Sequence, residues 1–68
     1  MKTWHLLYRT PSYAEANIIK GLLQQNQIQV MVLNKQDSSY INFGDIEVYV
    51  PVHLKDIAKN LLDRSLMN

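Results

Sequence analysis

Three short segments of this chain alternate apolar residues with others, and that alternation restricts the fold more than any other feature. Successive side chains of a β-strand point to opposite faces, so a period of two predicts strands with one face toward a core. The three segments are residues 3–10 (TWHLLYRT), 28–34 (IQVMVLN) and 45–51 (DIEVYVP). The side chains expected to face inward are Trp4, Leu6, Tyr8, Ile28, Val30, Val32, Ile46, Val48 and Val50.

Two further segments carry apolar residues at helical spacing, which predicts amphipathic helices. In residues 12–27 the apolar stripe consists of Ala16, Ile19 and Leu23, with Ile18 and Leu22 alongside. In residues 53–66 it consists of Leu54, Ile57, Ala58, Leu61 and Leu62. Each predicted helix therefore has one face that needs a sheet to cover it.

Residues typical of element ends lie between these segments. Pro11 and Pro51 each end a strand, because proline has no backbone donor for the ladder. Ser12 and Glu15 match a capping box, in which the hydroxyl accepts from the N3 amide while the glutamate reaches back. Asn26 is expected to end the first helix, since asparagine tolerates the left-handed conformation.

The predicted order of elements is therefore β-α-β-β-α. Strands two and three form an antiparallel hairpin, and a right-handed crossover places strand one parallel to strand two. Two amphipathic helices cover one face of the sheet. We predict one domain over residues 1–68, an α+β two-layer sandwich with sheet order 1-3-2 and two helices on one face.

Chain size and composition limit what can stabilise this domain. A chain of 68 residues has a barely sufficient core, and small domains usually add disulfides, a metal or a partner chain. Cysteine is absent, so disulfides and zinc-thiolate sites are excluded. Self-association, most simply a dimer, is the leading candidate for extra stability.

Charge and hydropathy argue against two kinds of partner. The formal net charge is +1, from seven basic and six acidic residues spread along the chain, so a strong grip on nucleic acid is not expected. No apolar run approaches the roughly 20 residues that span a bilayer. We therefore expect a cytoplasmic protein without a nucleic-acid or membrane partner.

The sequence carries no recognisable catalytic set. His5 and His53 each lack a second ligand at metal spacing, and the two glycines, Gly21 and Gly44, cannot form a phosphate-binding loop. No pair of carboxylates can be assembled from spacing alone. The expectation is a protein that is not an enzyme and needs no cofactor or metal.

Apolar residues on the outward side of the predicted sheet are the first feature that folding does not explain. They are Leu7, Met31, Leu33 and Tyr49, and the rim around them consists of Thr3, His5, Arg9, Gln29 and Glu47. An apolar centre with a polar rim is typical of an association surface. The alternative is an ordinary antiparallel sheet that tolerates some exposed apolar residues.

The second such feature is the long connection between strands two and three, residues 34–45 (NKQDSSYINFGD). Most hairpin loops have two to five residues, and longer ones are usually functional or disordered. Tyr40 and Phe43, with Ile41, stand among small polar residues, as in recognition loops. The alternative is that Tyr40 or Ile41 folds back as a lid over the core.

The chain resembles a small bacterial family, the putative prokaryotic signal-transducing proteins, whose function is unknown. The resemblance rests on LLYRT, EANIIKGLLQQNQIQVMVLN and IEVYVPVHLKDIAKNLL, and it covers nearly the whole chain. The sequence departs from the family at Gln27, where glycine is common. The family is similar to the ferredoxin-like PII nitrogen regulators, which signal through a long loop between strands two and three. Only the position of that loop carries over, without a ligand or a catalytic residue.

The resemblance also implies an open sheet edge. A full ferredoxin-like unit has a fourth strand beside strand one, and an unpaired edge can pair with another chain. The resulting hypothesis is a non-enzymatic protein-interaction or regulatory domain that acts through its sheet face, its strand edge and the 34–45 loop. The alternative is a PII-like sensor of a small molecule or nucleotide. The expected partners are a second copy, an unknown protein, or both.

Overall fold

The computed structural model describes residues 3–34 and 45–66. The strands are β1 (Trp4–Thr10), β2 (Met31–Asn34) and β3 (Ile46–Pro51). The helices are α1 (Tyr13–Gln25), the short 3-10 turn η1 (Val52–Leu54) and α2 (Lys55–Leu66). The order β-α-β-β-α is therefore confirmed, and β2 begins three residues later than the alternation predicts.

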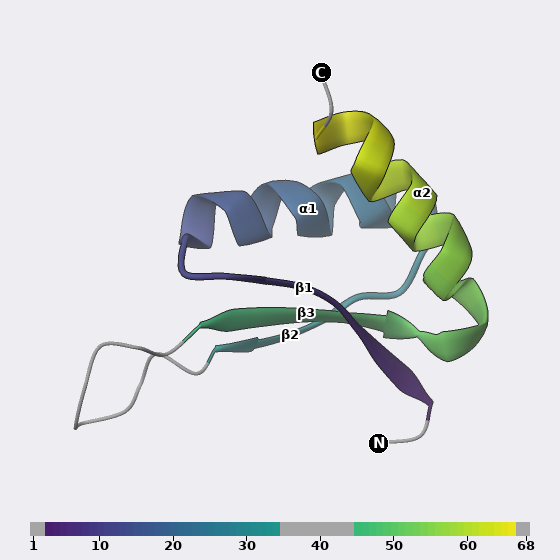
Figure 1. The fold of residues 1–68 in the computed structure, drawn as a ribbon, viewed down its shortest axis with the longest axis horizontal. Helices are drawn as coiled ribbons and strands as arrows, with labels where there is room; N and C mark the ends of the chain where they lie inside the picture. Colours follow the sequence, from purple (N-terminus) through teal and green to yellow (C-terminus); the bar gives the residue numbers. More distant parts are fainter. Residues whose placement is uncertain (1–2, 35–44, 67–68) are drawn as a thin grey trace.

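The sheet has the predicted order β1-β3-β2. Both outer strands run antiparallel to β3, so they are parallel to each other without touching. Figure 1 shows both helices on the same side of the sheet, where each contacts β1 and β3. The protein is thus an α+β sandwich of two layers, and the second face of the sheet is left open by the described elements.

The core lies between the sheet and the two helices. Its buried apolar residues are Ala16, Ile19, Leu23, Ile28, Ile46, Val48, Val50, Ala58 and Leu62. The strand β3 supplies the largest fully buried share of them, because every second residue of this central strand faces the helices. The inward residues expected for β3 are confirmed.

Three apolar residues expected in the core are exposed instead. Ile18 is 70% exposed and Ile57 is 55% exposed. Each precedes a buried residue by one position, which is about 100° around a helix and therefore on its flank. Val32 of β2 is 36% exposed, although it faces the helix side opposite Val48, because the two helices make their main contacts with the other strands.

A β-bulge changes the predicted faces of β1. Leu6 lies opposite Tyr49, but Tyr8 lies opposite the very next residue of β3, so Leu7 is an extra residue in the ladder. A bulge shifts the alternation by one position. Leu7 and Tyr8 both pack against the core, whereas the register places Leu6 and Trp4 on the open side. The inward prediction was therefore right for Tyr8 and wrong for Trp4 and Leu6.

The start of α1 is tied to the end of β1 by a hydrogen-bond network. The Ser12 hydroxyl accepts from the Glu15 backbone N–H at 3.1 Å, as the capping box predicts. The second bond of a capping box, from the Ser12 N–H to the glutamate, is not formed. The Ser12 N–H donates instead to the buried Thr10 hydroxyl at 3.1 Å. The Glu15 carboxylate instead accepts from Thr10 at 2.6 Å and from the Tyr8 hydroxyl at 3.1 Å. These contacts fix the angle between strand and helix.

The first helix ends at Asn26 as predicted, but the left-handed conformation expected there falls on Gln27, one residue later. Gln27 has φ of 62°, whereas Asn26 has φ of −100°. The Asn26 side chain donates to the Leu22 carbonyl at 2.9 Å, and the Ile28 N–H donates to the Leu23 carbonyl at 3.0 Å. A residue with a Cβ in the left-handed region costs roughly 1–2 kcal/mol, so this turn stores strain at Gln27.

We therefore expect Gln27→Gly to raise the free energy of unfolding by about 0.5–1 kcal/mol, because glycine adopts positive φ without steric cost but loses more entropy on folding. Urea denaturation followed by circular dichroism measures the change. The matched control is Gln25→Gly in the last turn of α1, which should destabilise by up to about 1 kcal/mol. Equal effects of the two substitutions would contradict the assignment of strain to residue 27.

Candidate interaction surface

The sheet face opposite the helices carries its side chains in rows set by the strand register. The central row is Leu6, Tyr49 and Met31; a second row is Arg9, Glu47 and Leu33; at the other end Trp4 lies opposite Pro51. We call these eight residues the open face. Figure 1 shows both helices on the other side of the sheet, and no described element covers the open face.

The open face is largely apolar, and its apolar members are already partly buried. Pro51 is buried, while Trp4, Leu6, Met31, Leu33 and Tyr49 are each partly shielded from solvent. Side chains directly opposite one another on paired strands lie close enough to interact. A second layer of protein could therefore remove the remaining exposed apolar surface without rearranging the strands.

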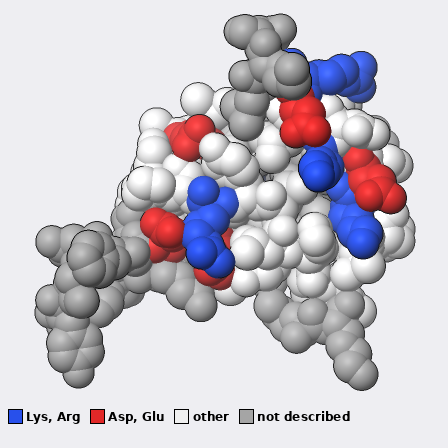
Figure 2. All heavy atoms as spheres, in the orientation of Figure 1, with Lys and Arg blue, Asp and Glu red and all other residues white. Residues whose placement is uncertain are grey.

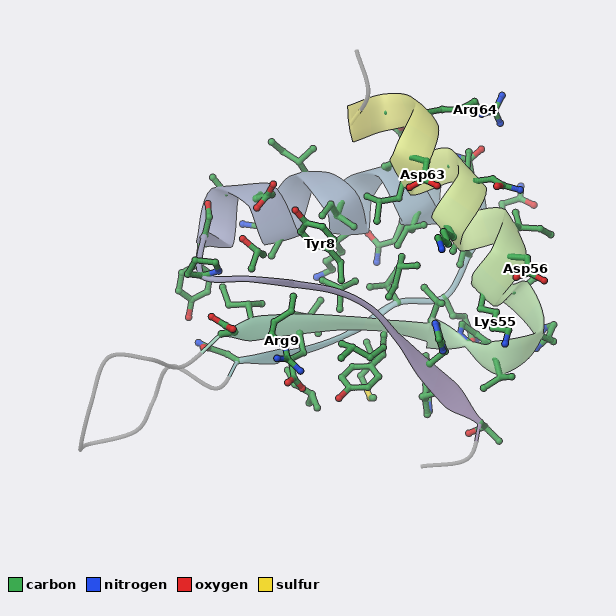
Figure 3. The ribbon with its side chains drawn as sticks, viewed as in Figure 1. Tyr8, Arg9, Lys55, Asp56, Asp63 and Arg64 are labelled. Carbon is green, nitrogen blue, oxygen red and sulfur yellow. The ribbon has the colours of Figure 1, made fainter. Side chains whose placement is uncertain are left out.

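The charged residues of the open face are Arg9 and Glu47, and they lie on paired strands. Arg9 Nε is 3.7 Å from Glu47 Oε2. The Arg9 side chain is 55% exposed but that of Glu47 is only 12% exposed. Figure 3 shows Arg9 and Tyr8, neighbours in β1, directed to opposite sides of the sheet. The carboxylate is thus held inside the face, while the guanidinium reaches solvent.

Tyr49 completes this polar cluster. Its hydroxyl donates to Glu47 Oε1 at 2.8 Å. This hydrogen bond is the main reason that the pKa of Tyr49 is raised above 10.0, with desolvation and the negative charge of Glu47 adding to it and Arg9 opposing it. Because charge-assisted hydrogen bonds offset the cost of withdrawing a carboxylate from water, Glu47 is tolerated among apolar neighbours.

The structure brings together five of the candidate residues. Met31, Leu33 and Tyr49 lie on the open face with Arg9 and Glu47. The placement of Leu7 was wrong, because the bulge turns it toward the core. His5 was also misplaced: it is exposed and lies opposite Val50, on the helix side. The candidates Tyr40 and Phe43 lie outside the described residues.

Three members of the open face, Trp4, Leu6 and Pro51, were not among the residues predicted for it. Trp4 and Leu6 occupy the positions that Leu7 and its neighbours were expected to fill. The segment WHLLY contains adjacent leucines, so either phase of the alternation is compatible with it. The adjacent leucines therefore indicated only that the phase of this strand was ambiguous, and the bulge at Leu7 shows which leucine lies on the open face.

Other kinds of site are not formed by the described part of the chain. Residues 3–34 and 45–66 contain no group of three His, Cys, Asp or Glu side chains able to hold a metal ion. Within the same ranges no pocket is formed, and no helix is long and apolar enough to cross a membrane. On the side of the molecule seen in Figure 2, basic and acidic side chains are interspersed without a block of one sign.

The fold and the open face together define a small α+β sandwich with one uncovered, apolar sheet face. A family model described as "Putative prokaryotic signal transducing protein" matches residues 4–64, which include parts of every strand and helix. The chain belongs to this family, whose description gives no mechanism. No curated protein and no solved structure matches the chain.

The hydrogen bond within the open face can be tested by titration. We expect Glu47→Gln to lower the pKa of Tyr49 toward its ordinary value, because the phenolate then no longer forms beside a negative charge. Carbon-13 NMR of tyrosine-labelled protein between neutral and high pH measures this pKa directly.

The matched control is Glu15→Gln on the helix side of the sheet. The Glu15 hydrogen bond is the main cause of the raised pKa of Tyr8, so this variant should lower that pKa and leave Tyr49 unchanged. A pKa of Tyr49 that does not move in Glu47→Gln would show that the contact between the two residues is absent in solution.

Proposed function

We propose that this chain is a non-enzymatic interaction domain that binds protein through the open face. The observation that supports this most is that the sheet face left uncovered by the helices is also mostly apolar. Contiguous apolar patches on a protein surface are often functional, and those with a polar rim are typical of protein interaction sites. The family's description as signal transducing is compatible with a role in recognition.

The residue types of the open face also favour this proposal. Interface centres are enriched in aromatic residues, methionine and arginine relative to the remaining surface. Trp4, Tyr49, Met31 and Arg9 are of these types, and all four share one side of the sheet. Trp4 and Tyr49 would supply most of the apolar contact area, because rigid aromatic rings lose little entropy on binding.

The polar cluster would contribute specificity rather than affinity. Glu47 is already bonded to Tyr49 and paired with Arg9, so a partner does not have to neutralise a bare carboxylate. Arg9 keeps much of its side chain in solvent and is free to move against an incoming surface. Interfacial charges of this kind mainly select partners and orient them.

The two faces of β2 offer a matched pair of variants. Leu33→Lys places a cation on the open face, and Val32→Lys places the same cation on the helix side one residue earlier. Both residues are at least partly exposed, and Leu33 lies opposite Glu47, so we expect both variants to remain folded by circular dichroism. Leu33→Lys should weaken partner binding by about tenfold or more, as expected when an anchor residue is lost.

Binding is measured by immobilising each variant and cross-linking what it holds before the wash, so that weak complexes are kept. Mass spectrometry then quantifies what each variant retains from an isotope-labelled extract of the cell that encodes it, its own labelled copies included. The proposal predicts retention by the wild type and Val32→Lys, and loss in Leu33→Lys. Equal retention by all three, or none by the wild type, would refute binding through the open face.

A further inference from the structure

We propose that the open face binds a second copy of this chain, face to face, about a two-fold axis that crosses the strands at the Leu6–Tyr49–Met31 row. This inference rests on the proposed function and names its partner. A two-fold interface uses the same patch on both copies, so that patch must be complementary to itself. The charges of the open face meet this condition.

The charge balance of the open face favours a copy of itself over a partner of one sign. Its charged residues are one cation, Arg9, and one anion, Glu47, side by side on paired strands. For a strongly acidic or strongly basic partner, attraction to one of these charges would be opposed by repulsion from the other. A second copy presents the same balanced pair, together with the same apolar row.

Two open faces can be stacked about a two-fold axis that runs either along β3 or across the strands, and the position of Glu47 favours the second. A two-fold axis along β3 would lay Glu47 of one copy over Glu47 of the other, and like charges brought together at an interface are costly. An axis across the strands reverses their direction and lays the Arg9–Glu47–Leu33 row over the row that contains Trp4 and Pro51. The exposed Arg9 guanidinium then meets the Trp4 ring, which is a favourable cation–π arrangement.

The row of Leu6, Tyr49 and Met31 lies on the axis that crosses the strands, so each of these residues lies opposite the same residue of the second copy. Tyr49 faces Tyr49, Leu6 faces Leu6 and Met31 faces Met31, while Glu47 keeps the partners it already has within its chain. Aligned sheets pack about 10 Å apart with strands within about 30° of one another. The arrangement therefore buries apolar residues and creates no unpaired charge.

The size of the open face predicts a weak dimer. The strands have seven, six and four residues. At about 3.3 Å per residue and 4.8 Å between strands, they cover a flat area of about 270 Å². Even if side chains double that area, two faces bury about 1,000 Å² in total, which is the range of weak and transient complexes. A dissociation constant in the micromolar range or above is expected.

Pairing through strand edges is less suited to a second copy. The edge strand β1 contains a bulge at Leu7, and the edge strand β2 has only four residues. Bulges and short lengths are features that discourage edge-to-edge pairing. The open face is therefore the better surface for self-association.

The absence of cysteine makes a clean cross-linking test possible, since each single-cysteine variant carries one reactive thiol. Met31→Cys lies on the proposed axis, so its two copies should be about 10 Å apart. Leu33→Cys lies two residues along the same strand, so its copies should be about 13 Å further apart along the strand direction. Lys20→Cys, exposed on α1, controls for random collision. The reagent is a bismaleimide with a two-carbon spacer.

We expect Met31→Cys to form a covalent dimer at least about fivefold faster than Leu33→Cys and Lys20→Cys, with light scattering of the wild type showing reversible dimers at about 1 mM. Cross-linking of Leu33→Cys as fast as Met31→Cys would overturn the axis. A monomer by light scattering, with no cross-linking above the Lys20→Cys control, would overturn the second copy as partner. In that case retention of a foreign protein that depends on Leu33 would still support the proposed function, whereas no retention would refute both.

Discussion

The structure depends on β3, the strand that is paired on both of its edges. One side of this strand buries Ile46, Val48 and Val50 beneath the two helices. Its other side presents Glu47 and Tyr49, which connect the outer strands across the open face. Any change that shifted β3 by one residue would exchange the core with the surface. The same six residues therefore determine both what stabilises the domain and what it can offer to a partner.

The sequence predicts β3 and the buried side of α1 well, because each has one unambiguous apolar period. It does not predict the phase of β1, since Leu6 and Leu7 are both apolar and only their pairing with β3 decides which one turns inward. The candidate surface shares this limit: Met31, Leu33 and Tyr49 follow from plain alternation, whereas Leu7 does not. Gln27 shows a similar limit, because nothing in its side chain indicates positive φ.

Each face of the sheet carries one hydrogen-bonded carboxylate, Glu15 on the helix side and Glu47 on the open face. Glu15 joins Tyr8 and Thr10 on the helix side and thereby fixes how α1 leaves β1. Glu47 joins Tyr49 and Arg9 on the open side, where a fully satisfied polar group can sit among apolar residues. The first cluster is explained by folding. The cluster of Glu47, Tyr49 and Arg9 adds fixed polar groups to an apolar surface, an arrangement suited to a weak and selective contact.

Association through the open face can be tested by a dilution series of the labelled wild-type protein, observed by two-dimensional NMR of its backbone amides and methyl groups. If the open faces associate, signals of Leu6, Met31 and Leu33 shift together as the concentration falls, while those of Ile18 and Ile57 on the exposed helix flanks stay constant. Shifts confined to the helix flanks, or no shift at any concentration, would contradict association through the open face.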